Sequence, residues 1–118
     1  MGTFQASIEI GDLQGQQYEA IDAMVDTGAT YSWVPRDVLA KLGVEPQFRR
    51  QFLTADGRSI EREMAETRVR FDGQELGTMV VFGDEGSLPL LGAYTLEGLG
   101  LAADPVGKRL IPVPGYAL

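Results

Sequence analysis

The sequence Asp26-Thr27-Gly28-Ala29-Thr30 comes directly after Tyr18 to Val25, a stretch whose alternating apolar residues are typical of a buried strand. Gly28 permits a tight turn directly after the strand, so the carboxylate of Asp26 is presented at the end of the strand. Much later, the apolar stretch Leu76 to Phe82 is followed by Leu90-Leu91-Gly92, a second strand-to-turn signal. Asp26 is therefore the first candidate for a chemically active group.

The remainder of the chain is also dominated by patterns typical of strands. Phe4 to Ile10 alternates apolar and polar residues, and Asp72-Gly73 is a strong signal for a two-residue hairpin turn. Pro35 and Gly43 bracket a short predicted helix from Arg36 to Leu42. The other predicted elements are a short helix from Gly92 to Leu96 and strands at Tyr31 to Val34, Phe52 to Thr54, Arg58 to Ile60, Thr67 to Phe71 and Lys108 to Val113. Such a pattern indicates an all-β, barrel-like fold, and 118 residues suit one domain spanning 1–118.

The composition narrows the possible chemistry. The chain has no cysteine and no histidine, which excludes disulfides, cysteine nucleophiles, serine–histidine triads and zinc sites built on either residue. Neither of the common glycine-rich phosphate-binding motifs occurs. Carboxylates that activate water, with no metal or other cofactor, are the simplest hydrolytic groups that remain.

The charge and the N-terminus bear on partners and location. A net charge of −7, with acidic and basic residues interspersed, disfavours nucleic-acid binding, and the basic pair Arg49-Arg50 is interpreted as part of a solvated loop. No apolar run approaches the length of a membrane span. Met1 to Ser7 lacks the features of a secretory signal and of a myristoylation site. We therefore expect a cytoplasmic protein that contacts neither membranes nor nucleic acid.

Several motifs, in order along the chain, resemble the retropepsin-like (clan AA) aspartic proteases. They are Val25 to Thr30, the predicted hairpin tip Ala55-Asp56-Gly57, and Leu90-Leu91-Gly92 with the helix that follows. More narrowly, Gly83-Asp84-Glu85-Gly86 and Thr95 to Leu101 make the chain similar to the small bacterial single-domain members. The resemblance implies a closed barrel of the acid-protease type with one or two short helices. It also implies that one subunit forms half of a two-fold active site.

The resemblance assigns roles to individual residues. It implies that Asp26 is catalytic and is contributed once by each subunit of a homodimer, that Thr27 braces the pair across the dimer axis, and that Gly28 points backbone amides at the carboxylates. Two adjacent carboxylates titrate as a unit, so the charged member can take a proton from water while the other hydrogen-bonds the peptide carbonyl. The substrate is a peptide or protein, and the residues expected to bind it are Ala29, Thr30, Thr54, Ala55, Asp56, Gly57 and Leu90.

Three positions near Asp26 bear on how the site would differ from its retroviral counterparts. Retroviral members commonly have an ion pair of Asp and Arg where this chain has Thr30 and Ala93; both partners are missing here, so no charge is stranded. A hydroxyl at position 29 would hydrogen-bond the carboxylate and stabilise its charged form, and Ala29 cannot do so. We therefore expect a pH optimum that is mildly acidic to near neutral.

Other functions remain open from the sequence alone. Asp26 can be an ordinary turn aspartate, and the sequence around Asp56 an ordinary hairpin. The first hypothesis is a homodimeric aspartic endopeptidase. The alternative is a non-catalytic peptide-binding or dimerisation module on the same fold, which would bind a peptide and leave it intact. A third is a glycosidase that uses two of the 17 acidic residues, although no second acid has a setting comparable to that of Asp26.

Overall fold

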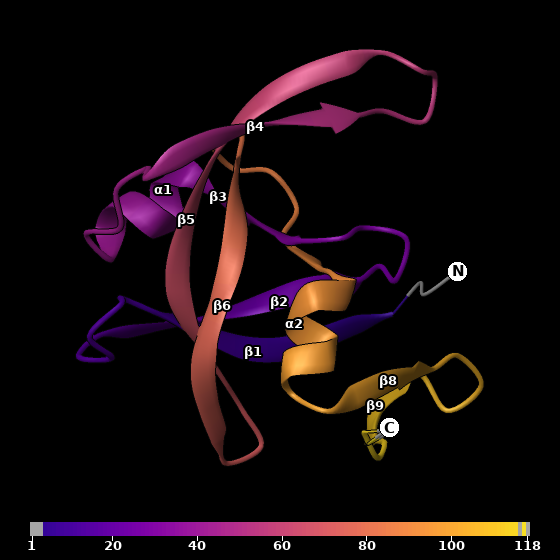
Figure 1. The fold of residues 1–118 in the computed structure, drawn as a ribbon. Coiled ribbons are helices and arrows are strands. Elements are labelled where there is room, and N and C mark those ends of the chain that lie inside the picture. Colours follow the sequence, from indigo (N-terminus) through magenta and orange to yellow (C-terminus); the bar gives the residue numbers. More distant parts are fainter. Residues whose placement is uncertain (1–3, 116, 118) are drawn as a thin grey trace.

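The computed structural model describes residues 4–115 and 117, which form nine strands and two short helices (Figure 1). The prediction of an all-β fold with two short helices is confirmed. Among the described residues, no helix has both the length and the apolar character needed to cross a membrane. In chain order the elements are β1 (Gln5–Gly11), β2 (Tyr18–Val25), β3 (Ser32–Pro35), α1 (Arg36–Lys41), β4 (Phe48–Leu53), β5 (Ser59–Phe71), β6 (Gln74–Gly83), β7 (Leu90–Leu91), α2 (Ala93–Gly98), β8 (Leu101–Asp104) and β9 (Arg109–Pro112).

Seven of the strands form one sheet that curls until β1 meets β5. The order of the strands is β1-β2-β7-β3-β6-β5-β4, and the additional pairing of β1 with β5 closes the barrel. Most neighbouring strands are antiparallel, but β2 runs parallel to β7 and β3 runs parallel to β6. Because Val25 pairs with Leu91 in the parallel ladder, the turns after β2 and β7 leave the sheet side by side. The strands β8 and β9 pair separately as a two-stranded sheet.

The apolar side chains that alternate along the strands fill the barrel. Val25 in β2 and Leu91 in β7 are fully buried, and the two helices add Leu39 from α1 and Leu96 from α2 to the same cluster. Each helix has only six residues, which is too short to be stable alone. Burying a leucine side chain stabilises by about 1.5–3 kcal/mol, so these contacts hold the helices against the sheet. The turns that follow β2 and β7 therefore rest on a packed core.

Polar contacts reinforce the closure between β1 and β5. The Arg70 guanidinium donates two hydrogen bonds to the Glu9 carboxylate, at 2.8 and 3.2 Å, and its Cζ atom lies 3.8 Å from the centre of the Tyr18 ring. The Thr67 hydroxyl donates to the carbonyl of Gly11. Hydrogen bonds from Arg70 lower the pKa of Glu9. The stabilisation from this pair is therefore present above the ordinary carboxyl range and is lost as the pH falls below it.

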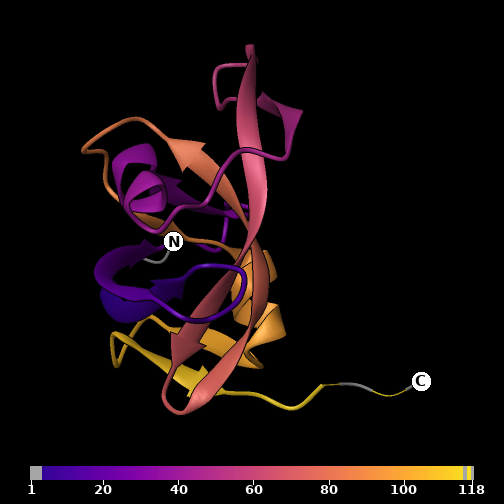
Figure 2. The same cartoon turned by 90° about the vertical axis from the view of Figure 1, so that its left-hand side faces the viewer.

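The β4–β5 hairpin extends beyond the barrel and stands clear of it in both views (Figures 1 and 2). Its tip is closed by hydrogen bonds from the Thr54 N–H to the Arg58 carbonyl, at 2.7 Å, and from the Gly57 N–H to the Thr54 carbonyl, at 3.0 Å. The Asp56 carboxylate accepts from the Thr54 hydroxyl and from Arg58 Nε, and these bonds lower the pKa of Asp56. The predicted turn at Ala55-Asp56-Gly57 is confirmed, and it is held mainly by its own residues.

The structure confirms some predicted elements to the residue and corrects others. The strand Tyr18–Val25 has the predicted bounds, and Asp72 and Gly73 both have positive φ, at 49° and 83°, as a two-residue hairpin turn requires. The interpretation of Arg49-Arg50 as a solvated loop is wrong, because both residues lie in β4, paired with β5. The strand β8 was not predicted. It forms through pairing with β9, which a local pattern of residues does not reveal.

Candidate active site

Asp26 lies at the point where β2 leaves the sheet. Its backbone N–H donates to the carbonyl of Leu91 at 3.0 Å, which continues the parallel β2–β7 ladder by one residue. The chain then turns back: the Gly28 N–H donates to Asp26 Oδ1 at 3.0 Å, and the Ala29 N–H donates to the Asp26 carbonyl at 3.1 Å. The Asp26 side chain is half-buried. The turn thus fixes the carboxylate, gives it one charge-stabilising amide, and leaves it in contact with solvent.

The turn after β7 packs against the turn after β2 with no room for a side chain between them. A Cβ atom on Gly92 would lie 2.5 Å from the Tyr31 carbonyl oxygen and 2.9 Å from the Ala29 carbonyl oxygen. Gly92 has a φ of −96°, so glycine is required there by space and not by backbone conformation. The first two N–H groups of α2 donate to the carbonyls of Ala29 and Thr30, both at 2.8 Å. The segment that follows Asp26 is therefore fixed by the start of α2.

A buried cluster of hydroxyl groups supports the same contact from below. Thr95 Oγ1 lies 2.7 Å from Ser32 Oγ and 2.8 Å from Thr78 Oγ1, and the Gly92 N–H donates to Ser32 Oγ at 3.0 Å. All three hydroxyl residues are buried. The cluster joins α2 to β3 and β6 by directional bonds, so it sets the position of α2 more closely than apolar packing alone would.

A cavity of about 720 Å³ separates the Asp26 turn from the β4–β5 hairpin. Asp26 is the only carboxylate among the described residues that line it. Of the residues that the sequence assigned to catalysis or substrate binding, those that line this cavity are Asp26, Gly28, Ala29, Thr30, Thr54 and Leu90. Those that do not line it are Thr27, Ala55, Asp56 and Gly57, since the first lies on the other side of the turn and the rest form the hairpin tip.

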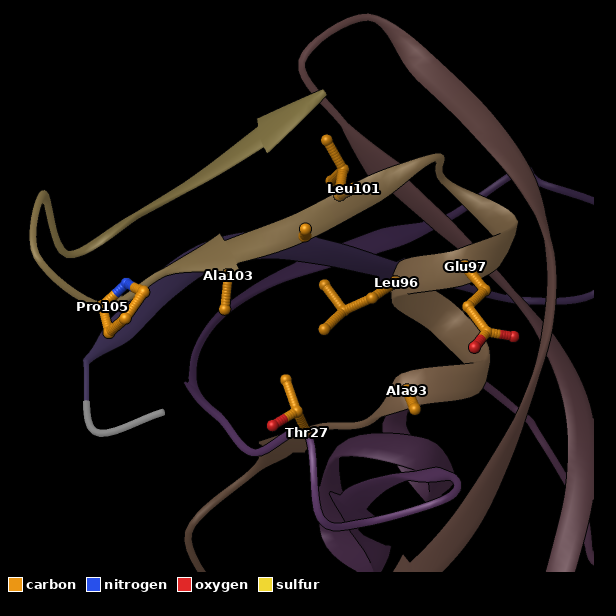
Figure 3. Close-up of a pocket in the computed structure, with 8 residues that line it drawn as sticks. Thr27, Ala93, Leu96, Glu97, Leu101, Ala103 and Pro105 are labelled. Carbon is orange, nitrogen blue, oxygen red and sulfur yellow. The ribbon is translucent and has the colours of Figure 1, made fainter. Parts of the chain in front are cut away.

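Thr27 faces a second cavity, of about 430 Å³, on the opposite side of the turn (Figure 3). In Figure 3 the Thr27 side chain points into the same hollow as Leu96 of α2 and Ala103 of β8. The lining is mostly apolar, and Thr27 itself is exposed. The structure thus separates the two polar residues of the turn: Asp26 belongs to the cleft under the hairpin, and Thr27 belongs to a surface beside α2.

Seven residues that line the cleft were not predicted as site residues: Tyr31, Trp33, Arg50, Gln51, Phe52, Leu53 and Ile60. Tyr31, Trp33 and Phe52 bring aromatic rings into it, with ring centres 6.3 Å apart for Tyr31 and Phe52 and 5.6 Å apart for Trp33 and Phe52. Arg50 adds a guanidinium, and its Cζ atom lies 5.8 Å from the centre of the Tyr31 ring. The alternation of Phe48, Arg50 and Phe52 could have placed these side chains on one face of a strand. The sequence does not say that this face looks toward Asp26, because that depends on the register with β5.

Among residues 4–115 and 117, no three His, Cys, Asp or Glu side chains gather in a way that could hold a metal ion. The chemistry that the described part of the cleft offers is that of a carboxylate positioned by a backbone amide, facing aromatic side chains and one guanidinium.

Comparison with known proteins agrees with this geometry. Residues 6–95 of the 118-residue chain match the family described as "Aspartyl protease", and the chain therefore belongs to the aspartyl protease family. Among solved structures, the chain is similar to the solution structure of Simian Foamy Virus (mac) protease, with a TM-score of 0.56 and 20% identity over 80% of this chain and 93% of that chain. At this identity the likeness establishes a retropepsin-like fold. No curated protein matches the sequence, and the narrower resemblance to bacterial members stays a prediction.

Gly92→Ala tests the contact between the two turns. The added Cβ would meet backbone oxygens that cannot move aside, so we expect the free energy of unfolding in urea to fall by at least about 3 kcal/mol. Gly98→Ala is the control, because a Cβ there meets only Leu76 Cδ1 at 3.5 Å and should change stability by less than about 1 kcal/mol. Equal effects of the two substitutions would contradict the account of the contact.

Thr95→Val tests the hydroxyl cluster. The substitution keeps the side-chain shape but leaves Ser32 Oγ and Thr78 Oγ1 without their shared partner, so we expect a loss of about 2 kcal/mol in the free energy of unfolding. In the control, Ser7→Ala, an exposed hydroxyl bonded to Asp22 is removed and the change should stay within about 0.5 kcal/mol. A Thr95→Val protein as stable as the Ser7→Ala protein would show that the cluster contributes nothing.

Proposed function

We propose that the protein is an aspartic endopeptidase that hydrolyses peptide bonds with a water molecule activated by two copies of Asp26, one from each subunit of a homodimer. The observation that carries the proposal is the setting of Asp26: a half-buried carboxylate at the end of β2, held by the Gly28 amide and facing a cleft of about 720 Å³. Membership of the aspartyl protease family supports the same reaction.

The need for a second subunit follows from the charges of the cleft. Water activation by a carboxylate pair requires two carboxyl groups in contact, and Asp26 is the only one that lines the described part of the cavity. The backbone groups of Asp26, Ala29 and Thr30 form hydrogen bonds with β7 and α2, and these bonds hold Asp26 in position. A second copy of the chain is the simplest source of an equivalent carboxylate. The exposed Thr27 and the apolar hollow beside it provide a surface next to Asp26 that this copy can cover.

The proposed reaction uses the two carboxyl groups in complementary forms. When they lie together, repulsion between the charges keeps one of them protonated. The ionised carboxylate accepts a proton from the bound water as the water oxygen attacks the carbonyl carbon of the peptide. The protonated carboxyl donates its proton to the carbonyl oxygen, which forms a neutral tetrahedral diol. Collapse of the diol breaks the carbon–nitrogen bond, returns a proton to the departing amine and leaves the pair with one proton, as at the start.

The cleft suits an extended peptide. It lies between the turn that follows Asp26 and the β4–β5 hairpin, so a peptide bound there can form backbone hydrogen bonds on both sides. Tyr31, Trp33 and Phe52 supply apolar surface for side chains of the peptide. The hairpin tip at Asp56 would then lie over the substrate of the assembled dimer. Ala55, Asp56 and Gly57 do not line the cavity of the single subunit, but in the dimer they would contact the substrate.

Asp26→Asn tests the proposal. The amide is similar in size to the carboxylate and accepts the Gly28 hydrogen bond through its oxygen, so the variant should fold and dimerise normally but lose at least about a thousandfold in kcat. Cleavage of a peptide library, followed by mass spectrometry, and analytical ultracentrifugation are the measurements. The matched control is Asp22→Asn, at an exposed aspartate of β2, the strand that precedes Asp26. Peptidase activity that persists in Asp26→Asn would contradict the assignment, and peptide binding without cleavage by the wild-type dimer would favour the non-catalytic module.

Ala29→Ser tests the role of the residue after the turn glycine. The methyl group of Ala29 offers no hydrogen bond, whereas a serine hydroxyl would stabilise the ionised carboxylate of the pair. We therefore expect the wild-type profile of kcat/KM against pH to peak between mildly acidic and near-neutral values, and the acidic limb of the variant to move to lower pH. A wild-type maximum near pH 2, or a variant limb displaced to higher pH, would contradict the explanation.

A further inference from the structure

The two faces of the β4–β5 hairpin carry different arrangements of charge. In the antiparallel register, Arg49 pairs with Glu63 and Gln51 with Glu61 on one face, which we call the outer face. Phe48 pairs with Met64, Arg50 with Arg62 and Phe52 with Ile60 on the other, which we call the inner face. The inner face looks into the cleft, because the Phe52 ring packs against Tyr31 and Trp33 and the Arg50 guanidinium lies near the Tyr31 ring. Arg50, Phe52 and Ile60 line the cavity that contains Asp26, as do Gln51 and Leu53 nearer the hairpin tip.

Charges on the outer face are paired. Arg49 Nε lies 3.0 Å from Glu61 Oε1, and Arg49 Nη1 lies 3.6 Å from Glu63 Oε2. Glu63 also accepts from Arg36 at 3.2 Å. Both glutamates of the hairpin are therefore directed away from the cleft and are already bonded to arginines.

The inner face, in contrast, has two positive charges and no acidic partner among the described residues. Arg50 and Arg62 are directly opposite each other, an arrangement of like charges that destabilises a strand pair. Arg62 donates from Nη1 to the Glu61 carbonyl at 3.2 Å, but its Nε is buried without a hydrogen-bond partner. A buried donor left unpaired is costly. The inner face thus carries two positive charges without an acidic partner among the described residues, and Arg50 is the member of the pair that lines the cleft and that an anion there can reach.

The Arg50 side chain is well placed for such an anion. Its Cζ atom lies 5.6 Å from the centre of the Phe48 ring and 5.8 Å from the centre of the Tyr31 ring. Both distances allow cation–π attraction, which favours this position of the exposed guanidinium beside the cleft and leaves its N–H groups available for a carboxylate. Arg50 is also the only basic residue among the described residues that line the cleft.

We propose that Arg50 determines substrate specificity by binding an acidic side chain, Glu or Asp, of the peptide that occupies the cleft. This inference rests on the proposed peptidase function and names the class of substrate. Arg50 makes the direct contact, and Arg62 adds to the positive potential behind it. The side chain that is recognised lies on the hairpin side of the substrate, away from the scissile bond at Asp26. The net charge of −7 alone would favour basic peptides, but the charges of the inner face oppose it at short range.

The test compares pairs of peptides that differ only by Glu or Gln at one position, scanned along both sides of the scissile bond. For the wild-type dimer, we expect kcat/KM to favour Glu by about tenfold at one position, and the preference to weaken in 0.5 M NaCl. Arg50→Gln should abolish the preference, Arg50→Lys should retain part of it, and Arg50→Glu should prefer Lys at that position. The matched control is Arg49→Gln, which removes a positive charge from the outer face and should leave the Glu/Gln ratio unchanged.

The outcomes separate this inference from the proposed function. Peptide cleavage with no preference for Glu at any position, or with a preference that survives in Arg50→Gln, would overturn the inference and leave the peptidase function intact. A wild-type protein that cleaves no peptide would overturn the peptidase function. In that case, binding of fluorescent Glu and Gln peptides to the Asp26→Asn protein, measured by anisotropy, decides the inference: about tenfold tighter binding of the Glu peptide supports it, and equal or absent binding overturns it. A change in dimer mass without a change in the ratio would assign Arg50 to the subunit interface instead.

Discussion

The contact between Gly92 and the carbonyl groups of Tyr31 and Ala29 is the constraint on which the rest of the site depends. A Cβ atom would be 2.5 Å from one of these oxygens, so the two turns can approach this closely only with glycine between them. The approach lets the first N–H groups of α2 reach the carbonyls of Ala29 and Thr30. These bonds replace water on a segment that has left the sheet, which is why the segment after Asp26 keeps an ordered path.

The same contact bears on why the described part of the chain supports the Asp26 carboxylate from several sides and places no second carboxylate in the cleft. The parallel pairing of β2 with β7 brings the turn after β7 to the place beside Asp26. The strand β7 contributes the apolar residues Leu90 and Leu91, and the start of α2 contributes backbone bonds. An acidic side chain in β7 would have to replace Leu91, which packs in the core, or Leu90, which lines the cleft. In the described part of the chain, the architecture therefore gives Asp26 firm support and one open side, and the proposed chemistry of a carboxylate pair requires a second subunit.

Sequence patterns predicted this site where the decisive interactions are local. The strand from Tyr18 to Val25 is marked by alternation, and the turn at Asp72-Gly73 by the two residues that tolerate its backbone angles best. The cleft was predicted in part, since Asp26, Gly28, Ala29, Thr30, Thr54 and Leu90 line it. What escaped prediction is non-local. The strand β8 exists through its pairing with β9, and the inward direction of Arg50 follows from a register that the sequence of β4 alone does not specify.

The position of β4 at the end of the sheet also bears on the meaning of Arg50. An edge strand needs charged side chains to prevent pairing with other chains, and this general requirement could explain two adjacent arginines. It does not explain their directions. Arg49 on the outer face already supplies a charge at the edge and is paired with Glu61 and Glu63, whereas Arg50 lies on the inner face, opposite Arg62, where like charges destabilise the hairpin. A charge placed where it weakens the strand pair, near aromatic rings and facing the cleft, is accounted for by a bound anion and not by protection of the edge.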